Sequence, residues 1–166
     1  MTRYSRQISL PEIGEGGQEK LHKARVLIVG AGGLGSPAAL YLAGAGVGTI
    51  GLADDDTVGI SNLQRQILYT ENEVGQLKVH CAAQRLRALN GNIEVHAYPF
   101  RLNRENARRL IADYDIVVDG CDNFSTRYLI SDSCSALHKP YVYGAIQGFE
   151  GQVSVFCYGD RPKTYR

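Results

Sequence analysis

Short apolar runs alternate with amphipathic segments along most of this chain. Apolar runs predict strands over residues 25–30, 49–53, 93–97, 115–119 and 141–146. Apolar residues at helical spacing predict helices over residues 34–45, 78–89, 103–111 and 124–137. Strands that alternate with helices in this way pair in parallel, so we predict an α/β fold with a Rossmann-like, doubly wound, mostly parallel sheet. Such sheets bind their ligands beyond the carboxyl ends of the strands.

The two ends of the chain depart from this alternation. Residues 1–10 are polar and carry Arg3 and Arg6, a pattern more typical of a disordered tail, and the segment that follows favours a helix in its second half. Residues 152–158 alternate weakly and predict a strand antiparallel to its predecessor. We therefore expect one domain with an N-terminal arm and helix (1–24), a Rossmann-like core (25–147) and the start of an antiparallel extension (148–166).

Composition narrows the class of protein. The 166 residues hold 18 Lys and Arg against 17 Asp and Glu, so the net charge of +1 predicts no nucleic-acid or membrane partner. No apolar run is long enough to span a bilayer, and the N-terminus lacks the apolar segment of a signal peptide. The four cysteines form no C-x-x-C pair, which predicts reduced thiols in a cytoplasmic protein and no zinc site.

A glycine-rich turn follows the first predicted strand. Residues 26–35 read V-L-I-V-G-A-G-G-L-G, which places Gly30, Gly32 and Gly35 in the G-x-G-x-x-G spacing. At such a turn the backbone amides and the positive end of the helix dipole can hold phosphate oxygens, provided that side chains are absent. The pattern favours a nucleotide site, and a close-packed turn without a ligand is the alternative.

Acidic residues follow two other predicted strands. Asp54 lies 19 residues after Gly35, where a Rossmann fold places the acid that binds the ribose hydroxyls, with a solvated acidic turn as the alternative. The sequence D-G-C-D-N at 119–123 follows the fourth strand, so both acidic groups and the glycine turn should share one edge of the sheet. The polar stretch at 57–76 has no clear period and predicts a functional loop.

Cations near this edge separate two kinds of nucleotide chemistry. A dinucleotide dehydrogenase does not need Arg65 and Lys78 beside a metal-binding acid, whereas a nucleoside triphosphate, with about four negative charges, does. When a carboxylate attacks the α-phosphate, Arg, Lys and Mg²⁺ neutralise the charge that grows on the leaving pyrophosphate. Asp122 is the natural Mg²⁺ ligand. Residue types thus favour nucleotidyl transfer; the alternatives are a solvated Lys78, an ion-paired Arg65, and Asp122 or Asn123 as a helix cap.

Six motifs lie along the chain at characteristic positions. They are R-Y-S-R-Q at 3–7, V-G-A-G-G-L-G-S-P at 29–37, D-D-D-T-V-G-I-S-N-L-Q-R-Q at 54–66, V-G-Q-L-K at 74–78, D-G-C-D-N at 119–123 and F-E-G-Q-V-S-V-F at 149–156. In these motifs the sequence resembles the ThiF/MoeB group of adenylating proteins, relatives of the ubiquitin-activating enzymes. The resemblance covers nearly the whole chain, and the spacing of S-N-L-Q-R-Q from the glycine turn is highly specific.

The resemblance implies that ATP adenylates the C-terminal Gly-Gly carboxylate of a small ubiquitin-like sulfur-carrier protein, in thiamin or molybdopterin biosynthesis. It also implies ATP and Mg²⁺ as cofactors and a homodimer in which Arg6 reaches the phosphates of the other subunit. The implied catalytic residues are Arg6, Arg65, Lys78 and Asp122, with Asp122 holding Mg²⁺. The implied nucleotide-binding residues are Gly30, Gly32, Gly33, Asp54, Asp56, Ser61, Asn62, Leu63, Gln64, Arg65, Lys78, Asp122 and Asn123.

Two departures from the family pattern set alternatives. The family's domain is normally longer, so we expect this chain to lack its C-terminal part, and zinc-bearing relatives place a C-x-x-C pair where residues 163–166 here read K-T-Y-R. The alternatives are an NAD-dependent oxidoreductase of Rossmann fold and an inactive nucleotide-binding or dimerisation fragment. Within the family, Leu63 and Gln64 fit the sulfur-carrier group better than the relative that dehydrates a tRNA adenosine modification.

Overall fold

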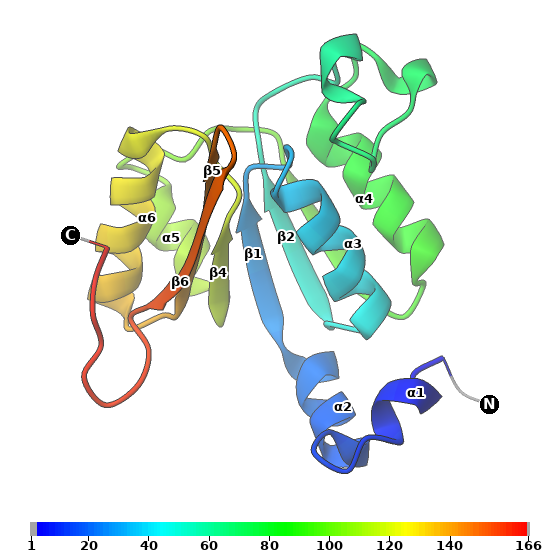
Figure 1. Ribbon diagram of the computed structural model, residues 1–166, viewed down its shortest axis with the longest axis vertical. Coiled ribbons are helices and arrows are strands. Elements are labelled where there is room, and N and C mark those ends of the chain that lie inside the picture. The colour runs from blue at the N-terminus through cyan, green and yellow to red at the C-terminus, as the bar shows by residue number, and fades with distance from the viewer. Residues whose placement is uncertain (1–2, 166) are drawn as a thin grey trace.

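The computed structural model describes residues 3–165, so residues 1, 2 and 166 of the predicted arm and extension lie outside the described residues. A six-stranded sheet in the order β3-β2-β1-β4-β5-β6 forms its centre (Figure 1). Its strands are β1 (Arg25–Val29), β2 (Thr49–Ala53), β3 (Glu94–Tyr98), β4 (Ile116–Asp119), β5 (Tyr141–Gln147) and β6 (Glu150–Phe156). Neighbouring strands from β3 to β5 pair in parallel, and β6 pairs antiparallel with β5. The predicted mostly parallel sheet with an antiparallel extension is confirmed.

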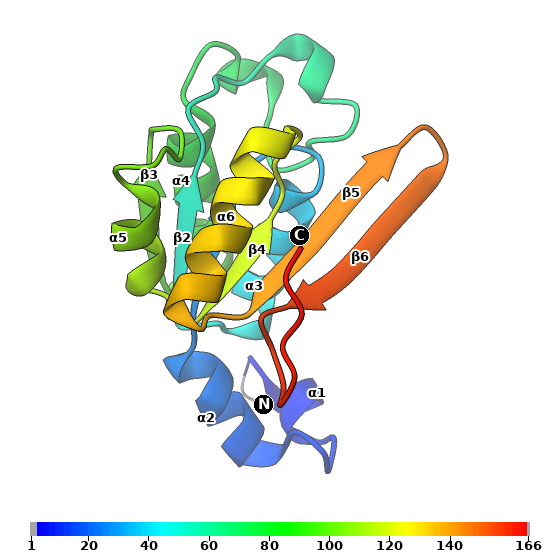
Figure 2. The same ribbon diagram turned by 90° about the vertical axis from the view of Figure 1, so that its left-hand side faces the viewer.

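Helices cover both faces of this sheet (Figure 1 and Figure 2). They are α1 (Ser5–Ile8), α2 (Gly14–Lys23), α3 (Gly35–Ala45), α4 (Lys78–Leu89), α5 (Ala107–Ala112) and α6 (Phe124–Leu137). One apolar cluster contains Ile28 and residues of α3 and α4, and a second contains Leu27 and residues of α5 and α6. Successive β1 side chains therefore enter opposite cores, which explains the continuous apolar run of this strand.

Residues 3–10 of the N-terminal arm are ordered, unlike the disordered tail that their polarity suggests. Gln7 donates a hydrogen bond from Nε2 to the Ala45 carbonyl oxygen at 3.1 Å. Asn90 donates from Nδ2 to the Tyr4 hydroxyl at 2.8 Å. These contacts fix the arm to the ends of α3 and α4, and α1, which carries Arg6, lies beside the amino ends of the strands (Figure 1).

Two local departures from the predicted helices have identifiable causes. The predicted helix over 103–111 begins only at Ala107, because the Asn103 side chain accepts hydrogen bonds from the amides of Glu105 and Asn106 and holds a turn instead. The loop predicted over 57–76 contains two short 3-10 helices, η1 (Ile60–Asn62) and η2 (Glu71–Glu73). No helix within residues 3–165 is long and apolar enough to cross a membrane.

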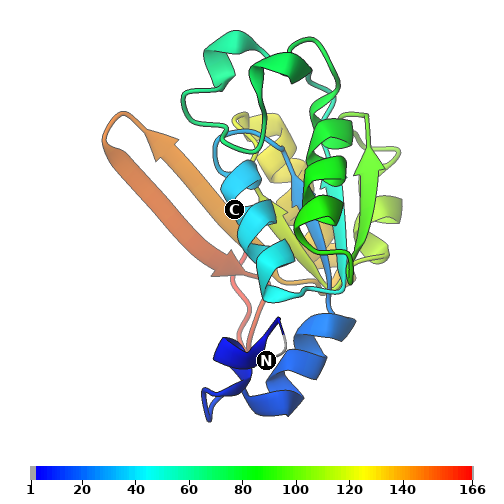
Figure 3. The ribbon, with the colours of Figure 1, turned by 90° about the vertical axis from the view of Figure 1, so that its right-hand side faces the viewer.

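The β5–β6 hairpin projects from the side of the sheet (Figure 2 and Figure 3). On one face, Tyr143 and Phe156 pack against the second apolar cluster. On the other face Val153 and Val155 are exposed, and the tip residue Phe149 is fully exposed. The hairpin thus contributes to the core with only one of its two faces.

The end of β1 is a close meeting of backbone segments. Gly30 has a positive φ of 89°, and a Cβ atom there would lie 2.7 Å from the carbonyl group of Gly120, which follows β4. A Cβ atom on Gly35, the first residue of α3, would overlap the Gly30 carbonyl oxygen. Packing alone therefore requires glycine at these positions.

Two substitutions in α3 test this packing. We expect Gly35→Ala to lower the free energy of unfolding by about 3 kcal/mol, because the new methyl group meets backbone that cannot move aside. Gly44→Ala serves as the matched control, since Gly44 is exposed and has open space around its Cα. That substitution should raise the free energy of unfolding by about 0.5–1 kcal/mol. Urea denaturation of both variants measures the difference, and equal midpoints would contradict the packing argument.

Candidate functional site

A cleft of about 1040 Å³ lies at the carboxyl ends of the strands. The glycine turn and the D-D-D segment after β2 form one part of its lining, and the D-G-C-D-N loop and the β5–β6 hairpin form another. Most of the predicted site residues line it, namely Gly30, Gly32, Gly33, Asp54, Asp56, Asn62, Arg65, Lys78, Asp122 and Asn123. The fold thus brings together residues that are far apart in the sequence.

Four other predicted residues do not line this cleft. Leu63 packs against the first apolar cluster, and the Ser61 carbonyl oxygen accepts a hydrogen bond from Arg65 Nη1 at 3.3 Å. Gln64 is exposed on the same loop. Arg6 lies on α1, at the opposite end of the sheet from the cleft (Figure 1). Contact of these four residues with a ligand stays a prediction.

The glycines of the turn divide into two kinds. Gly30 and Gly35 are required by backbone packing, as described above. A Cβ atom on Gly32 would lie 3.5 Å from Gln66 Nε2, and one on Gly33 would lie 3.6 Å from Arg65 Cδ, both of which are ordinary contacts. Packing of the chain therefore does not require glycine at these two cleft positions, and their bareness leaves backbone open to a ligand.

Asp54 is fixed at the end of β2 by two hydrogen bonds. Its Oδ2 accepts from the Ala31 amide of the glycine turn at 2.7 Å, and its Oδ1 accepts from the Asp56 amide at 2.8 Å. A freely solvated acidic turn does not describe this arrangement. The glycine turn, through the Ala31 amide, instead orients the Asp54 carboxylate.

Lys78 is a buried cation. Its side chain is 5% exposed, and Nζ lies 2.9 Å from Asp56 Oδ2, which belongs to a side chain that is 69% exposed. The Lys78 amide also donates to the Asp56 carbonyl oxygen at 3.0 Å. The alternative of a solvated helix residue is wrong, because a buried ammonium group needs a partner and has one here.

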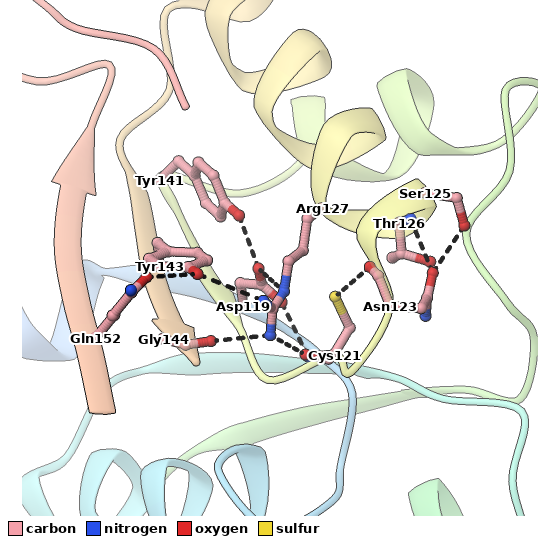
Figure 4. Close-up of polar contacts among 10 residues, drawn as sticks. All are labelled: Asp119, Cys121, Asn123, Ser125, Thr126, Arg127, Tyr141, Tyr143, Gly144 and Gln152. Carbon is pink, nitrogen blue, oxygen red and sulfur yellow. Dashed lines mark hydrogen bonds and ion pairs between the residues drawn. The ribbon is translucent and has the colours of Figure 1, made fainter. Parts of the chain in front are cut away.

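Asn123 and Asp122 have different local roles. Asn123 Oδ1 accepts from the Thr126 amide at 3.0 Å and from Ser125 Oγ at 2.8 Å, so Asn123 is the N-cap of α6 (Figure 4). The helix-cap alternative therefore holds for Asn123, which still lines the cleft. Asp122 is exposed in the cleft and has no ion-pair partner among residues 3–165. Its carboxylate is available to a ligand.

Acidic side chains also gather after β2. Carboxylate oxygens of Asp54, Asp55 and Asp56 lie within 4.8 Å of one another, which is close enough for a shared cation. Asp54 is engaged by two backbone amides and Asp56 by the Lys78 ammonium group. Asp55 and Asp122 are both exposed in the cleft, and their carboxylates have no ion-pair partner among residues 3–165.

Two cleft residues escaped the sequence prediction. Gln66 is buried, and its Oε1 has no hydrogen-bond partner within residues 3–165. Arg127 is 9% exposed, and its Nη2 donates to the Cys121 carbonyl oxygen at 2.8 Å (Figure 4). Gln66 directly follows Arg65 in the quoted loop motif, and Arg127 lies four residues after Asn123. Helical spacing on the first turn of α6 could have pointed to Arg127, since side chains there lean back over the N-terminus.

The Cys121 thiol, which lines the cleft, has low nucleophilic reactivity. Burial, and next the negative charge of Asp119, raise the pKa of Cys121 to about 12. The thiol is therefore protonated at neutral pH, and it cannot serve as a nucleophile in this state.

Comparisons with known proteins place this geometry in context. The sequence model of the ThiF family matches residues 4–166. The chain is 52% identical over 162 residues to the probable molybdopterin-synthase adenylyltransferase of Porphyra purpurea, which covers 98% of this chain and 42% of that protein. It is 50% identical over 170 residues to the sulfur carrier protein adenylyltransferase of Thermus thermophilus, and this match covers 100% of this chain and 63% of that protein. The chain thus spans less than two thirds of these relatives.

Solved structures with a similar fold also match this chain. The crystal structure of PaaA matches with a TM-score of 0.82 at 28% identity, over 93% of this chain and 50% of that one. The structure of E. coli MccB with AMPCPP and MccA matches with a TM-score of 0.77 at 29% identity. This match covers 87% of this chain and 44% of the MccB chain. Neither the curated relatives nor these structures favour the oxidoreductase alternative.

A substitution at the α6 cap tests the role of Asn123. Asn123→Ala should lower the free energy of unfolding by about 1 kcal/mol, because the Thr126 amide loses its acceptor. Asn123→Asp keeps an acceptor oxygen and adds a negative charge at the helix N-terminus, so it should be close to the unaltered protein in stability. Thermal and urea unfolding measure both. A destabilisation of the same size in both variants would show that the cap is not the cause.

Proposed function

Since this chain belongs to the ThiF family, we propose that it binds ATP and adenylates the C-terminal carboxylate of a small ubiquitin-like sulfur-carrier protein that ends in Gly-Gly. Relatives at 50–52% identity are named adenylyltransferases of a sulfur carrier protein or of molybdopterin synthase. The names of these relatives favour molybdopterin biosynthesis as the pathway, and thiamin biosynthesis is the second candidate.

One observation carries the proposal. A stretch of bare backbone at Gly32 and Gly33 shares a cleft with Arg65, Lys78 and Asp122. Phosphate oxygens fit against such a turn, and two cations beside it suit a triphosphate better than a dinucleotide. The volume of about 1040 Å³ leaves room for ATP and for the end of a second substrate.

The proposed reaction transfers an adenylyl group. A carboxylate oxygen of the carrier attacks the α-phosphorus, a P–O bond to that carboxylate forms, and the bond to the bridging oxygen of the leaving pyrophosphate breaks. The products are an acyl adenylate and pyrophosphate. Arg65 and Lys78 are placed to neutralise the charge that grows on pyrophosphate. No proton has to be removed from the carrier, because its carboxylate is already ionised at neutral pH.

Asp122 suits the Mg²⁺ ion that the family implies. Its carboxylate lines the cleft without an ion-pair partner among residues 3–165, and carboxylate oxygen is the ligand that Mg²⁺ prefers. When bound, Mg²⁺ supplies charge neutralisation on the phosphates. In the chain itself, Asp122 presents an exposed anionic oxygen to the cleft.

The hairpin side of the cleft suits the carrier. Tyr143, Ala145 and Gln152 line this half. An extended Gly-Gly terminus carries no side chains and could therefore reach the phosphates along this half without displacing the lining. The approach of the carrier to this half is part of the proposal.

A homodimer is the remaining part of the proposal. Arg6 sits at the amino ends of the strands, so it cannot reach the cleft of its own chain without unfolding the arm that Gln7 holds. A second subunit would supply it. A cytoplasmic location fits the four cysteines, each of which is a free thiol.

Isotope exchange tests the proposed activity. With the carrier present, the full-length protein should exchange labelled pyrophosphate into ATP, and Asp122→Ala should reduce that exchange by about 100-fold or more. Asp160→Ala is the matched control, since Asp160 is exposed and does not line the cleft. Absence of exchange in the unaltered protein, or full exchange in Asp122→Ala, would overturn the proposal.

A bare position of the turn tests nucleotide binding. Gly33→Ala should leave the melting temperature without ligand nearly unchanged, because the methyl group has space beside Arg65. It should abolish the rise in melting temperature that ATP produces in the unaltered protein. That rise reflects a gain in the free energy of unfolding of about 2.7 kcal/mol when ATP is at 100 times its dissociation constant. Gly16→Ala, on α2 with open space around it, should keep that rise. A rise with NAD but none with ATP would favour the oxidoreductase instead.

A further inference from the structure

We propose that Arg127 is a positioning residue that sets the place of Asp122 by fixing the D-G-C-D-N loop against the β5–β6 hairpin. This inference rests on the proposed function, in which Asp122 acts on the nucleotide. Arg127 comes from the first turn of α6, at the floor of the cleft (Figure 4).

The Arg127 guanidinium group joins two walls of the cleft. Nη2 donates to the Cys121 carbonyl oxygen at 2.8 Å and to the Gly144 carbonyl oxygen at 3.4 Å. Nη1 donates to the Tyr143 hydroxyl at 3.4 Å. Cys121 belongs to the loop after β4, whereas Gly144 and Tyr143 belong to β5. One side chain therefore spans the loop and the hairpin (Figure 4).

The charge of Arg127 is already compensated. Its Nε lies 3.6 Å from Asp119 Oδ2, and the Asp119 side chain is completely buried. Tyr141 donates its hydroxyl hydrogen to the same Oδ2 at 2.7 Å. Burial opposes the charge of Arg127, but Asp119, Cys121 and Tyr143 together outweigh it and raise the pKa of the guanidinium group. The pair adds no net charge to the cleft, so its contribution is geometric rather than attraction of an anion.

The backbone on both sides of Asp122 is held. The Cys121 amide donates to Asp119 Oδ1 at 2.9 Å, and the Cys121 carbonyl oxygen accepts from Arg127. On the other side, Asn123 caps α6. Asp122 itself is exposed and has no ion-pair partner among residues 3–165, so these neighbours determine where its backbone holds the start of its side chain.

The contacts of Arg127 also extend to the second strand of the hairpin. Tyr143, which accepts from Arg127, donates its hydroxyl hydrogen to Gln152 Oε1 on β6 at 3.3 Å. A continuous set of contacts thus runs from Asp119 through Arg127 to β6 (Figure 4). The carrier half of the cleft and the Asp122 loop are held at one separation by this set.

Lysine cannot take over this role. A lysine ammonium group is a single point of charge on a flexible stem, whereas the planar guanidinium group holds acceptors on two elements in a fixed geometry. In the full-length protein with its carrier, Arg127→Lys should lower kcat of pyrophosphate exchange by about 10- to 100-fold, because a small misplacement of a reacting group has effects of that size. The KM for ATP should stay within about two-fold, because the nucleotide wall is untouched.

Two further variants make the test decisive. Arg104→Lys is the matched control, because Arg104 is exposed and lies outside the cleft, and its kcat should be unchanged. Tyr143→Phe removes one of the three hydrogen bonds that Arg127 donates and keeps the ion pair with Asp119, with little effect on folding, so its kcat should fall less than that of Arg127→Lys. It provides the measurement should Arg127→Lys melt below the assay temperature.

The outcomes separate this inference from the proposed function. Unchanged kcat in both variants, with normal exchange in the unaltered protein, would overturn the positioning role alone. A loss confined to KM for ATP would also overturn it, since Arg127 would then bind the nucleotide. Absence of exchange in the unaltered protein would overturn the proposed function, and this inference with it.

Discussion

The geometry of the cleft depends on the point where β1 ends and two other backbone segments touch it. The Gly30 carbonyl oxygen faces the start of α3 at Gly35 and the loop after β4 at Gly120, so closely that a methyl group fits at none of the three. Because these contacts join backbone to backbone, the glycine turn and the Asp122 loop are held at a fixed separation. Packing does not require glycine at the neighbouring Gly32 and Gly33, which present bare backbone to the cleft.

Each wall of the cleft contains a cation held by an acid, and the two pairs differ in exposure. Asp56, the partner of Lys78, is 69% exposed, so water can solvate it when an incoming anion attracts the lysine. Asp119, the partner of Arg127, is fully buried, and breaking that pair would leave an uncompensated charge inside the protein. The Lys78 wall can therefore respond to a ligand, whereas the Arg127 wall keeps its shape. This division suits the proposed function, in which phosphates move beside Lys78 and Asp122 stays in place.

The sequence predicted those features that depend on local pattern, and it missed those that depend on tertiary contact. Alternating strands and helices, the glycine turn and the acid after the second strand all follow from spacing along the chain. The role of Arg127 does not, because its acceptors lie on β5 and on the loop after β4, and periodicity alone does not bring these together. Similarly, the arm is ordered by Asn90, 86 residues away from Tyr4. Contact of the predicted site residues with a ligand stays a prediction, although most of them share one cleft.

The four cysteines share a property with a practical consequence. Burial raises the pKa of Cys81, Cys121, Cys134 and Cys157. For Cys121, a value of about 12 means that about one molecule in 100,000 carries a thiolate at pH 7. A thiolate, and not a thiol, attacks the S–S bond of a persulfide or disulfide, so the protonated Cys121 thiol reacts slowly with such compounds. Under the proposed function, the cleft could therefore adenylate a carrier beside activated sulfur without Cys121 capturing that sulfur.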